Sequence, residues 1–146
     1  MPRVAHLFRA PKRRLPMEEI ESADAVVNLG FLNCTHARKN GPRQVLLVDK
    51  ETLDAMGLFP GIIRENITTE GLNVNGLTIG ERLRVGPVLL QVSAVCTPCD
   101  QLEKVRPGLR RELYGRRGML CRVVEGGTIL VGDTIQRVSA AASAYS

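Results

Sequence analysis

The amino-acid sequence predicts a mainly β fold, a closed or half-closed β-barrel of short strands with a few small helices. In several short segments, apolar and polar residues alternate with a period of two, which is typical of half-buried strands. Glycines interrupt these segments every few residues, as at positions 71, 76, 80 and 86, and such punctuation indicates tight turns. Helical spacing of apolar residues is confined to short stretches, so the helices are expected to be small.

The first half of the chain is expected to contain four short strands separated by polar loops. These strands are predicted at residues 3–8, 25–29, 44–48 and 62–69. A basic turn bounded by prolines follows the first strand, and a polar loop with Cys34 and His36 precedes the third. Asp49 is predicted to cap a brief helix over residues 50–56.

The second half is expected to be richer in strands. They are predicted at residues 77–79, 83–85, 88–95, 118–124 and 128–131, with a last strand that ends near residue 138. Residues 125–128 (EGGT) are typical of a two-residue hairpin turn. Asp100, with Glu103 three residues later, predicts a helix N-cap and its capping-box partner. This helix is expected to restart after Gly108 and to end at Gly115.

Length and composition restrict the functions that are open to the chain. Its 146 residues predict one domain over residues 1–138, followed by a flexible C-terminal tail at 139–146. The net charge of +5 suits an anionic ligand, whereas an aromatic content of 3% leaves few side chains to stack on bases, so no nucleic acid is expected as a partner. The sequence shows no signal peptide and no apolar run of about 18 residues, so we expect no membrane partner and a cytoplasmic location.

The clearest candidate for chemistry is Cys99. The strand at 88–95 runs into Cys96-Thr97-Pro98-Cys99, and Pro98 predicts a turn because it removes a backbone donor and fixes φ. Cys99 is then expected just ahead of a helix N-terminus, where the helix dipole favours a thiolate. In a reducing compartment the four cysteines are expected to be thiols, metal ligands or catalytic groups.

Other interpretations of the Cys96-x-x-Cys99 pair stay open. A structural zinc site would need further ligands from Cys34, His36 or Cys121. Thiol–disulfide exchange favours such a pair in a βαβ unit, which the β-rich surroundings do not offer. Cys96 is also credible as a small buried hydrophobe because it continues the strand. Cys121 lies on the apolar face of a predicted strand, as a core residue does.

Basic residues gather near this turn in the sequence. They are Arg64, Arg106, Arg110, Arg111, Arg116, Arg117 and Arg122. Guanidinium groups bind phosphate through paired hydrogen bonds and lower the pKa of a neighbouring thiol, so the set predicts an anionic ligand beside Cys99. Arg64 and Arg116 are the first candidates for ligand contact, and Arg117 is a further candidate. His36 is a candidate general base or proton donor.

Five separated strings resemble the signature motifs of the MOSC domain family, named after the C-terminal domain of molybdenum cofactor sulfurase. They are RENITTEG at 64–71, LTIGERLRVG at 77–86, CTPCDQLE at 96–103, GRRG at 115–118 and GGTILVGD at 126–133. Their order and spacing fit as well, and residues 43–56 are similar to the small stand-alone members. The resemblance covers about residues 3–138 and implies the MOSC, or pyruvate-kinase-like, barrel.

The resemblance also implies roles for particular residues. In the family, the cysteine of the Pro-Cys pair is thought to carry sulfur as a persulfide or to coordinate molybdenum directly, and here that residue is Cys99. The arginine–asparagine pair of the family corresponds to Arg64 and Asn66. Members of this size commonly carry Gly-Asp-x-His in the early loop, whereas this chain has Asn33-Cys34-Thr35-His36 and so keeps the histidine but replaces the acid.

The leading hypothesis is a sulfur carrier or transfer protein, or a molybdenum-cofactor-binding protein. Cys99 would accept sulfur or ligate molybdenum, while the arginines would hold the molybdenum cofactor (molybdopterin). If the chain is an enzyme, it would be sulfurtransferase-like or part of a molybdenum-cofactor-dependent reductase. A non-catalytic module that binds and delivers the cofactor is the alternative, and a structural zinc domain is a third.

The hypothesis also implies that the chain works with partner proteins. A domain of this length has no room for a pyridoxal-phosphate desulfurase, so pyridoxal phosphate is expected only on a separate sulfur donor. The expected partners are a cysteine desulfurase or other sulfur donor and, as a further candidate, a molybdoenzyme.

Overall fold

The protein is built from two β-sheets and a few short helices. A computed structural model describes residues 1–12, 15–37 and 39–138. In this part of the chain, an eight-stranded sheet has the spatial order β11 (Ile135–Val138), β7 (Arg82–Val85), β8 (Val88–Val95), β9 (Met119–Glu125), β5 (Val45–Asp49), β6 (Ile67–Glu70), β1 (Arg3–Arg9) and β2 (Glu18–Ile20). A three-stranded sheet has the order β10 (Gly127–Leu130), β3 (Ser22–Val26) and β4 (Gly30–Phe31). The mainly β prediction is confirmed.

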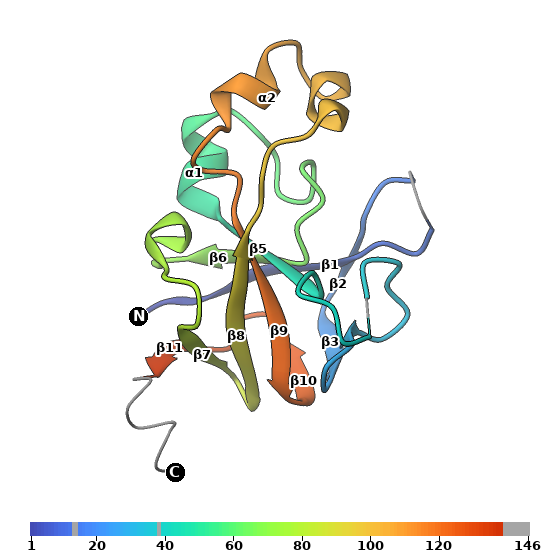
Figure 1. The fold of residues 1–146 in the computed structure, drawn as a ribbon, viewed down its shortest axis with the longest axis vertical. Coiled ribbons are helices and arrows are strands. Elements are labelled where there is room, and N and C mark those ends of the chain that lie inside the picture. The colour runs from blue at the N-terminus through green and yellow to red at the C-terminus, as the bar shows by residue number, and fades with distance from the viewer. Residues whose placement is uncertain (13–14, 38, 139–146) are drawn as a thin grey trace.

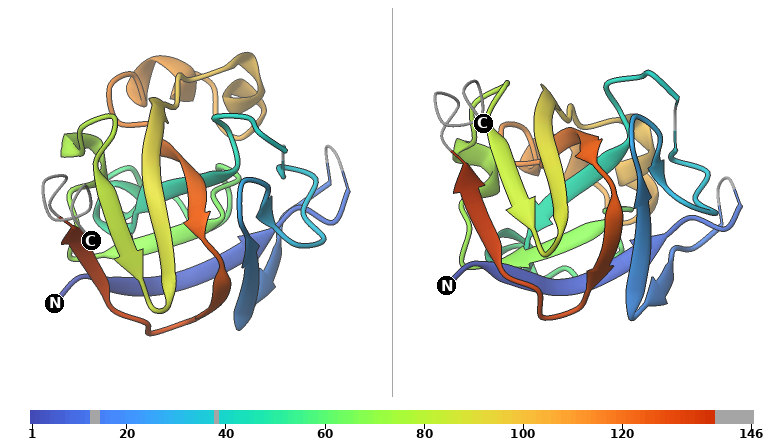
Figure 2. Two further views of the ribbon diagram at one scale, coloured as in Figure 1. Left: turned by 60° about the horizontal axis from the view of Figure 1, so that its bottom comes forward. Right: turned by 90° about the horizontal axis from the view of Figure 1, so that it is seen from below.

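The predicted closed or half-closed barrel is not confirmed. The large sheet ends at β11 on one side and at β2 on the other, and the small sheet is hydrogen-bonded separately. The sheets curve around a shared interior (Figure 2), and a single bridge between Arg3 and Thr134 brings the β11 end back to β1. Among the described residues, the backbone hydrogen bonds at this point join only residues 2–4 to residues 132–135 and do not continue as a ladder between β1 and β11, as closure would need.

Three short helices gather at one end of the molecule, namely α1 (Lys50–Ala55), α2 (Leu109–Glu112) and the 3₁₀ helix η2 (Asp100–Lys104). The 3₁₀ helix η1 (Val74–Gly76) lies apart from them, beside β6 (Figure 1). Figure 1 shows α1 and α2 beyond the ends of β8 and β9. Asp49 caps α1 as predicted, because its side chain accepts a hydrogen bond from the backbone N–H of Thr52. In the described ranges, no helix is both long and apolar enough to cross a membrane.

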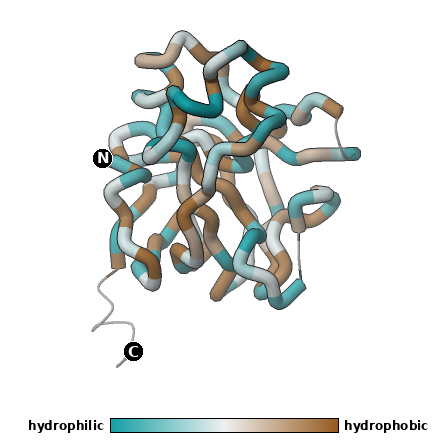
Figure 3. The backbone as a smooth tube through the Cα atoms, turned by 45° about the horizontal axis from the view of Figure 1, so that its top comes forward, coloured by the Kyte–Doolittle hydropathy of each residue, from teal (hydrophilic) through white to brown (hydrophobic). Residues whose placement is uncertain are grey.

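Two hydrophobic clusters fill the interior. The larger lies between the sheets and joins strands of both, for example Phe31 and Ile129 of the small sheet to Leu47 and Leu90 of the large one. The smaller packs the helices against the outer face of β5. Hydrophobic residues run through the strands in the body of the molecule (Figure 3). Because the second cluster fixes the helices over the sheet, it fixes the position of the loops between them.

The predicted strand at residues 62–69 is only partly correct. The strand β6 begins at Ile67, and residues 61–63 form a turn in which the Arg64 N–H donates to the Gly61 carbonyl oxygen at 3.0 Å. The buried Glu65 carboxylate accepts from the Gly61 N–H at 2.8 Å. Side-chain hydrogen bonding to the backbone therefore overrides the β-branched composition of this segment.

The predicted hairpin at residues 125–128 is wrong. The strand β10 pairs with β3 rather than with β9, so this turn carries the chain from the large sheet to the small one. A side chain at Gly126 would place its Cβ 2.8 Å from the Ala25 carbonyl oxygen. Glycine is therefore needed because two backbone segments approach closely here. This need explains the glycine without a hairpin turn.

The helix start after the cysteines also differs from the prediction. Cys99, not Asp100, is the N-cap residue, and the helix that follows is the 3₁₀ helix η2. The Glu103 carboxylate accepts hydrogen bonds from the backbone N–H groups of Arg110 and Gly108, which lower its pKa. Glu103 thus caps the start of α2, and the predicted restart of the helix after Gly108 is confirmed. The single domain at 1–138 stays a prediction, and the tail at 139–146 lies outside the described residues.

Candidate functional site

A cavity of about 860 Å³ opens between the large sheet and the helical end of the molecule. Its walls include residues 15–17, 43–46 and 60–64, together with side chains from the segment 96–105, and these parts lie far apart in the sequence. Among the predicted site residues, it brings together Cys99, His36, Arg64, Asn66 and Arg117. The site is therefore assembled by the fold and not by one motif.

Arg116 is the predicted site residue that does not line this cavity. Its side chain is exposed, and its Nε donates to the Glu112 carbonyl oxygen at 3.0 Å, at the end of α2. The next residue, Arg117, points inward. The prediction that named Arg116 a first choice for ligand contact has no support in this geometry.

The two cysteines of the pair lie in different environments within the same cavity. Cys99 is exposed and Cys96 is buried. Burial raises the pKa of the Cys96 thiol, and the positive charges of Arg117 and Arg43 oppose that shift. Cys99 is therefore the thiol that a ligand or a donor can reach.

No turn forms between the two cysteines, contrary to the turn predicted at Pro98, and the backbone of Cys99 is extended at φ −124° and ψ 170°. Residues 96–99 form neither a turn nor a bend, and the Cys96 N–H still pairs with the Gly118 carbonyl oxygen beside β9. Both cysteines are free thiols in this structure, which gives thiol–disulfide exchange between them no direct support.

The structural zinc hypothesis is not supported either. In the parts of the chain that the structure covers, no three His, Cys, Asp or Glu side chains come together as a metal site. The Cys34 sulfur instead accepts hydrogen bonds from the Ala10 N–H at 3.3 Å and the Asn66 Nδ2 at 3.5 Å. Cys121 is fully buried in the core between β5 and β8, as predicted.

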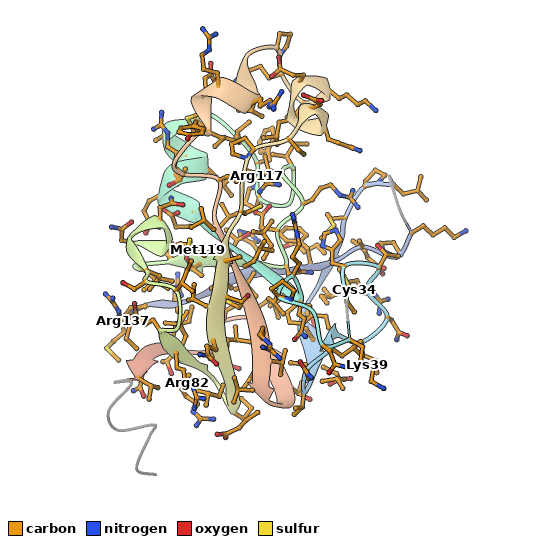
Figure 4. All side chains as sticks on the ribbon, viewed as in Figure 1. Cys34, Lys39, Arg82, Arg117, Met119 and Arg137 are labelled. Atoms are coloured by element: carbon orange, nitrogen blue, oxygen red, sulfur yellow. The ribbon has the colours of Figure 1, made fainter. Side chains whose placement is uncertain are left out.

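The most unusual group in the cavity wall is the guanidinium of Arg117. The residue is 7% exposed, and Figure 4 shows it at the junction between the sheet and the helices. Its Nη2 donates to the Ile63 carbonyl oxygen at 2.8 Å. Within the described residues, neither Nε nor Nη1 has a hydrogen-bond partner. A buried charge with open donors is costly unless an anion meets it, so this group fits an anionic ligand.

Arg64 reaches the cavity from a strained turn. Its backbone lies in the left-handed region at φ 68°, and its Nη1 donates to the Leu15 carbonyl oxygen at 2.6 Å. Gly61 precedes it at φ 84°, where a Cβ would lie 2.7 Å from the Phe8 ring. The turn thus brings Arg64 and the segment 15–17 together on one side of the cavity.

Asn66 lies in the cavity wall with its amide engaged inside the protein. Its Oδ1 accepts from the Leu46 N–H at 2.9 Å, and its Nδ2 donates to the Phe8 carbonyl oxygen at 3.3 Å. The side chain therefore ties β1 to β5. These contacts favour a role in shaping the wall around the ligand.

Two cations of the cavity were missed by the sequence analysis, Arg43 and Lys104. With Arg64 and Arg117 they make four positive side chains, and no carboxylate is among the described lining residues. Within the described residues, none of the four forms a salt bridge, whereas the cations that do form salt bridges lie elsewhere. Those are Arg3, Arg9, Lys50, Arg84, Arg106, Arg110 and Arg137. Positive charge is therefore concentrated along the wall of this cavity.

Solved structures of other proteins share this fold. The YuaD protein from Bacillus subtilis superimposes with a TM-score of 0.75 at 20% identity, over 92% of this chain and 94% of that one. YiiM from Geobacillus stearothermophilus gives 0.76 at 17% identity, over 95% and 76%, and YiiM from Escherichia coli gives 0.72 at 19%, over 94% and 70%. At these identities the likeness concerns the fold alone. A comparison with curated protein sequences found no match.

The sequence itself identifies the family. The model of the MOSC domain matches residues 40–136, which is more than half of the chain. The matched range contains Arg64, Cys99 and Arg117, and it leaves His36 just outside. The chain belongs to the MOSC domain family.

Proposed function

We propose that the chain binds the molybdenum cofactor in this cavity and carries sulfur on Cys99. The observation that supports it best is the combination of an exposed thiol with four cations in one cavity, none of which forms a salt bridge within the described residues. MOSC domains are associated with the molybdenum cofactor in general, and an anionic pterin suits such a cavity by charge.

The residues present fit an anionic cofactor. Arg117 would hold an anionic group through Nε and Nη1, the two buried N–H donors that have no partner in the described residues. Arg43, Arg64 and Lys104 would neutralise further negative charge around it. When bound, the cofactor would supply a redox-active metal centre with affinity for sulfur ligands.

Cys99 would take up sulfur by exchange with a donor persulfide. Its thiolate attacks the outer sulfur of the donor, a new S–S bond forms at Cys99, and the S–S bond of the donor breaks. The donor's inner sulfur leaves as a thiolate, and the proton stays on the transferred sulfur. No oxidant or reductant is consumed. His36 lines the same cavity and would exchange a proton with the bound group.

Cofactor binding and sulfur transfer can be tested on the same purified protein. The purified chain is incubated with molybdenum cofactor released from a molybdoenzyme, unbound cofactor is removed, and the retained pterin is oxidised and measured by fluorescence. Wild type should retain pterin, and Cys99→Ala should retain it but accept no sulfur. A wild-type protein that retains no pterin would contradict cofactor binding. A Cys99→Ala variant that still gains sulfur would contradict the role of Cys99.

A further inference from the structure

An apolar rim surrounds the mouth of the cavity. It is formed by Leu15, Phe59, Ile62 and Val105, which are 48%, 80%, 43% and 36% exposed. Leu15, Ile62 and Val105 line the cavity, and Phe59 directly precedes the lining residues 60–64. Three separate segments of the chain thus place large apolar side chains at one opening. Exposed apolar side chains that gather around an opening mark an interaction site more often than scattered ones do.

Positively charged side chains lie beside the apolar rim. Arg43, Arg64 and Lys104 line the same cavity, and within the described residues none of them forms a salt bridge. A surface with an apolar centre and uncompensated cations complements a protein face that has an apolar centre and acidic residues. Phe59 is the kind of aromatic side chain that anchors such interfaces.

A partner is also required by the chemistry. This inference rests on the proposed function, in which Cys99 receives sulfur that the chain does not generate. The donor's persulfide must come within bonding distance of the Cys99 sulfur, so the donor's surface must meet the mouth of the cavity. The apolar rim is the surface that the donor would meet.

We propose that the apolar rim of Leu15, Phe59, Ile62 and Val105 docks a sulfur-donor protein, which presents a persulfide to Cys99 from an acidic face with an apolar centre. The sulfur step is the exchange described above and needs no other reactant. A small persulfide needs no docking surface and should react with Cys99 directly.

The experiment compares two donors. One is a purified cysteine desulfurase of the same organism charged with cysteine, and the other is glutathione persulfide. Sulfur on Cys99 is measured over time by peptide mass spectrometry for wild type, for a Phe59→Ser rim variant and for a Leu130→Ser/Val131→Ser control. The control residues are also exposed, at 51% and 46%, and they lie at the end of β10.

The rim variant should lose about tenfold or more in the rate from the desulfurase, because anchors at an interface commonly contribute at least 1.4 kcal/mol, a factor of ten. Its rate from glutathione persulfide should match wild type, and the control should match with both donors. Added salt should slow the desulfurase reaction more than the glutathione persulfide reaction.

Several outcomes would overturn the proposal. Equal losses with both donors would mean that the rim shapes the cavity or touches the small ligand. No loss of rate with either donor would show that the rim takes no part in sulfur transfer. A wild type that forms a dimer, which the rim variant abolishes, would assign the rim to a second copy of the chain. If wild type accepts sulfur from glutathione persulfide and not from the desulfurase, the docking proposal fails while the role of Cys99 stands. If it accepts from neither, the proposed function fails.

Discussion

The Nη2 of Arg117 donates a hydrogen bond to the carbonyl oxygen of Ile63 at 2.8 Å, and this contact holds a buried guanidinium against the turn that carries Arg64. In the described part of the chain, the other donors at Nε and Nη1 have no partner. One nitrogen of the side chain thus fixes its place in the wall, and two remain for a ligand.

Arg117→Gln should weaken retention of the molybdenum cofactor by about 10- to 100-fold, because a hydrogen bond to a charged group contributes about 1.5 to 3 kcal/mol. Arg116→Gln is the matched control, since the neighbouring Arg116 is exposed and lies outside the cavity. Its affinity should stay within about twofold of wild type. Dissociation constants from fluorescence titration, with melting temperatures of both variants, are the measurements. Equal weakening in the two variants would argue against a specific site at Arg117.

Limited alkylation should distinguish the four cysteines. Cys99 is exposed, whereas Cys34, Cys96 and Cys121 are buried. Iodoacetamide at neutral pH should label Cys99 first, and Cys96 should follow more slowly because burial raises its pKa. Peptide mass spectrometry over a time course gives the order. Labelling of Cys96 ahead of Cys99 would be incompatible with the proposed reactive sulfur.

The stability of the fold should fall at high pH because of Cys121. Burial raises the pKa of this thiol from 9.0 to about 12. Between these two values the unfolded chain loses the proton while the folded chain keeps it, so deprotonation favours unfolding as the pH rises. The loss is on the order of 4 kcal/mol across the full window.

Cys121→Val removes the titrating group and keeps a side chain of similar size. The free energy of unfolding, measured with urea at pH 8 and at pH 11, should fall less for the variant than for wild type. The comparison within each protein separates this effect from the titration of lysines and tyrosines, which both proteins share. Identical decreases would show that Cys121 does not contribute.

Glu65 should be important for the stability of the turn at residues 61–64. Its Oε2 accepts from the Gly61 N–H and from the Thr68 hydroxyl, both at 2.8 Å. Glu65→Ala leaves two donors without an acceptor and should lower the free energy of unfolding by about 2 to 4 kcal/mol. Glu65→Gln keeps an acceptor oxygen and should lose less. Urea unfolding of both variants measures the difference, and equal losses would mean that the acceptor is not the cause.

Strong local patterns were sufficient to predict much of the scaffold. The alternation through residues 88–95 and the cap at Asp49 appear as predicted in β8 and α1. Elements that depend on long-range pairing were harder to predict. The EGGT turn has the sequence of a hairpin, yet β10 pairs with β3, about a hundred residues earlier in the chain. No local signal reports which strand a new strand will join.

The site was predictable where a motif or a period marked it. Cys99 followed from its position after a strand and a proline. Arg117 lies just before β9, and no period in the sequence distinguishes it from the exposed Arg116, so only the fold shows which of the two enters the cavity. Arg43 and Lys104 carry no such signal, because only the folding of distant segments places them in one cavity.

The most direct test of the central claim is the location of a transferred sulfur. The purified chain is treated with glutathione persulfide, excess reagent is removed, and intact and peptide mass spectrometry locate any added sulfur. We predict one added sulfur atom on Cys99, none on Cys96, and none anywhere in Cys99→Ala. Sulfur on Cys96, or a Cys99 that stays unmodified while the protein is folded, would contradict the claim that Cys99 is the sulfur-carrying residue of this cavity.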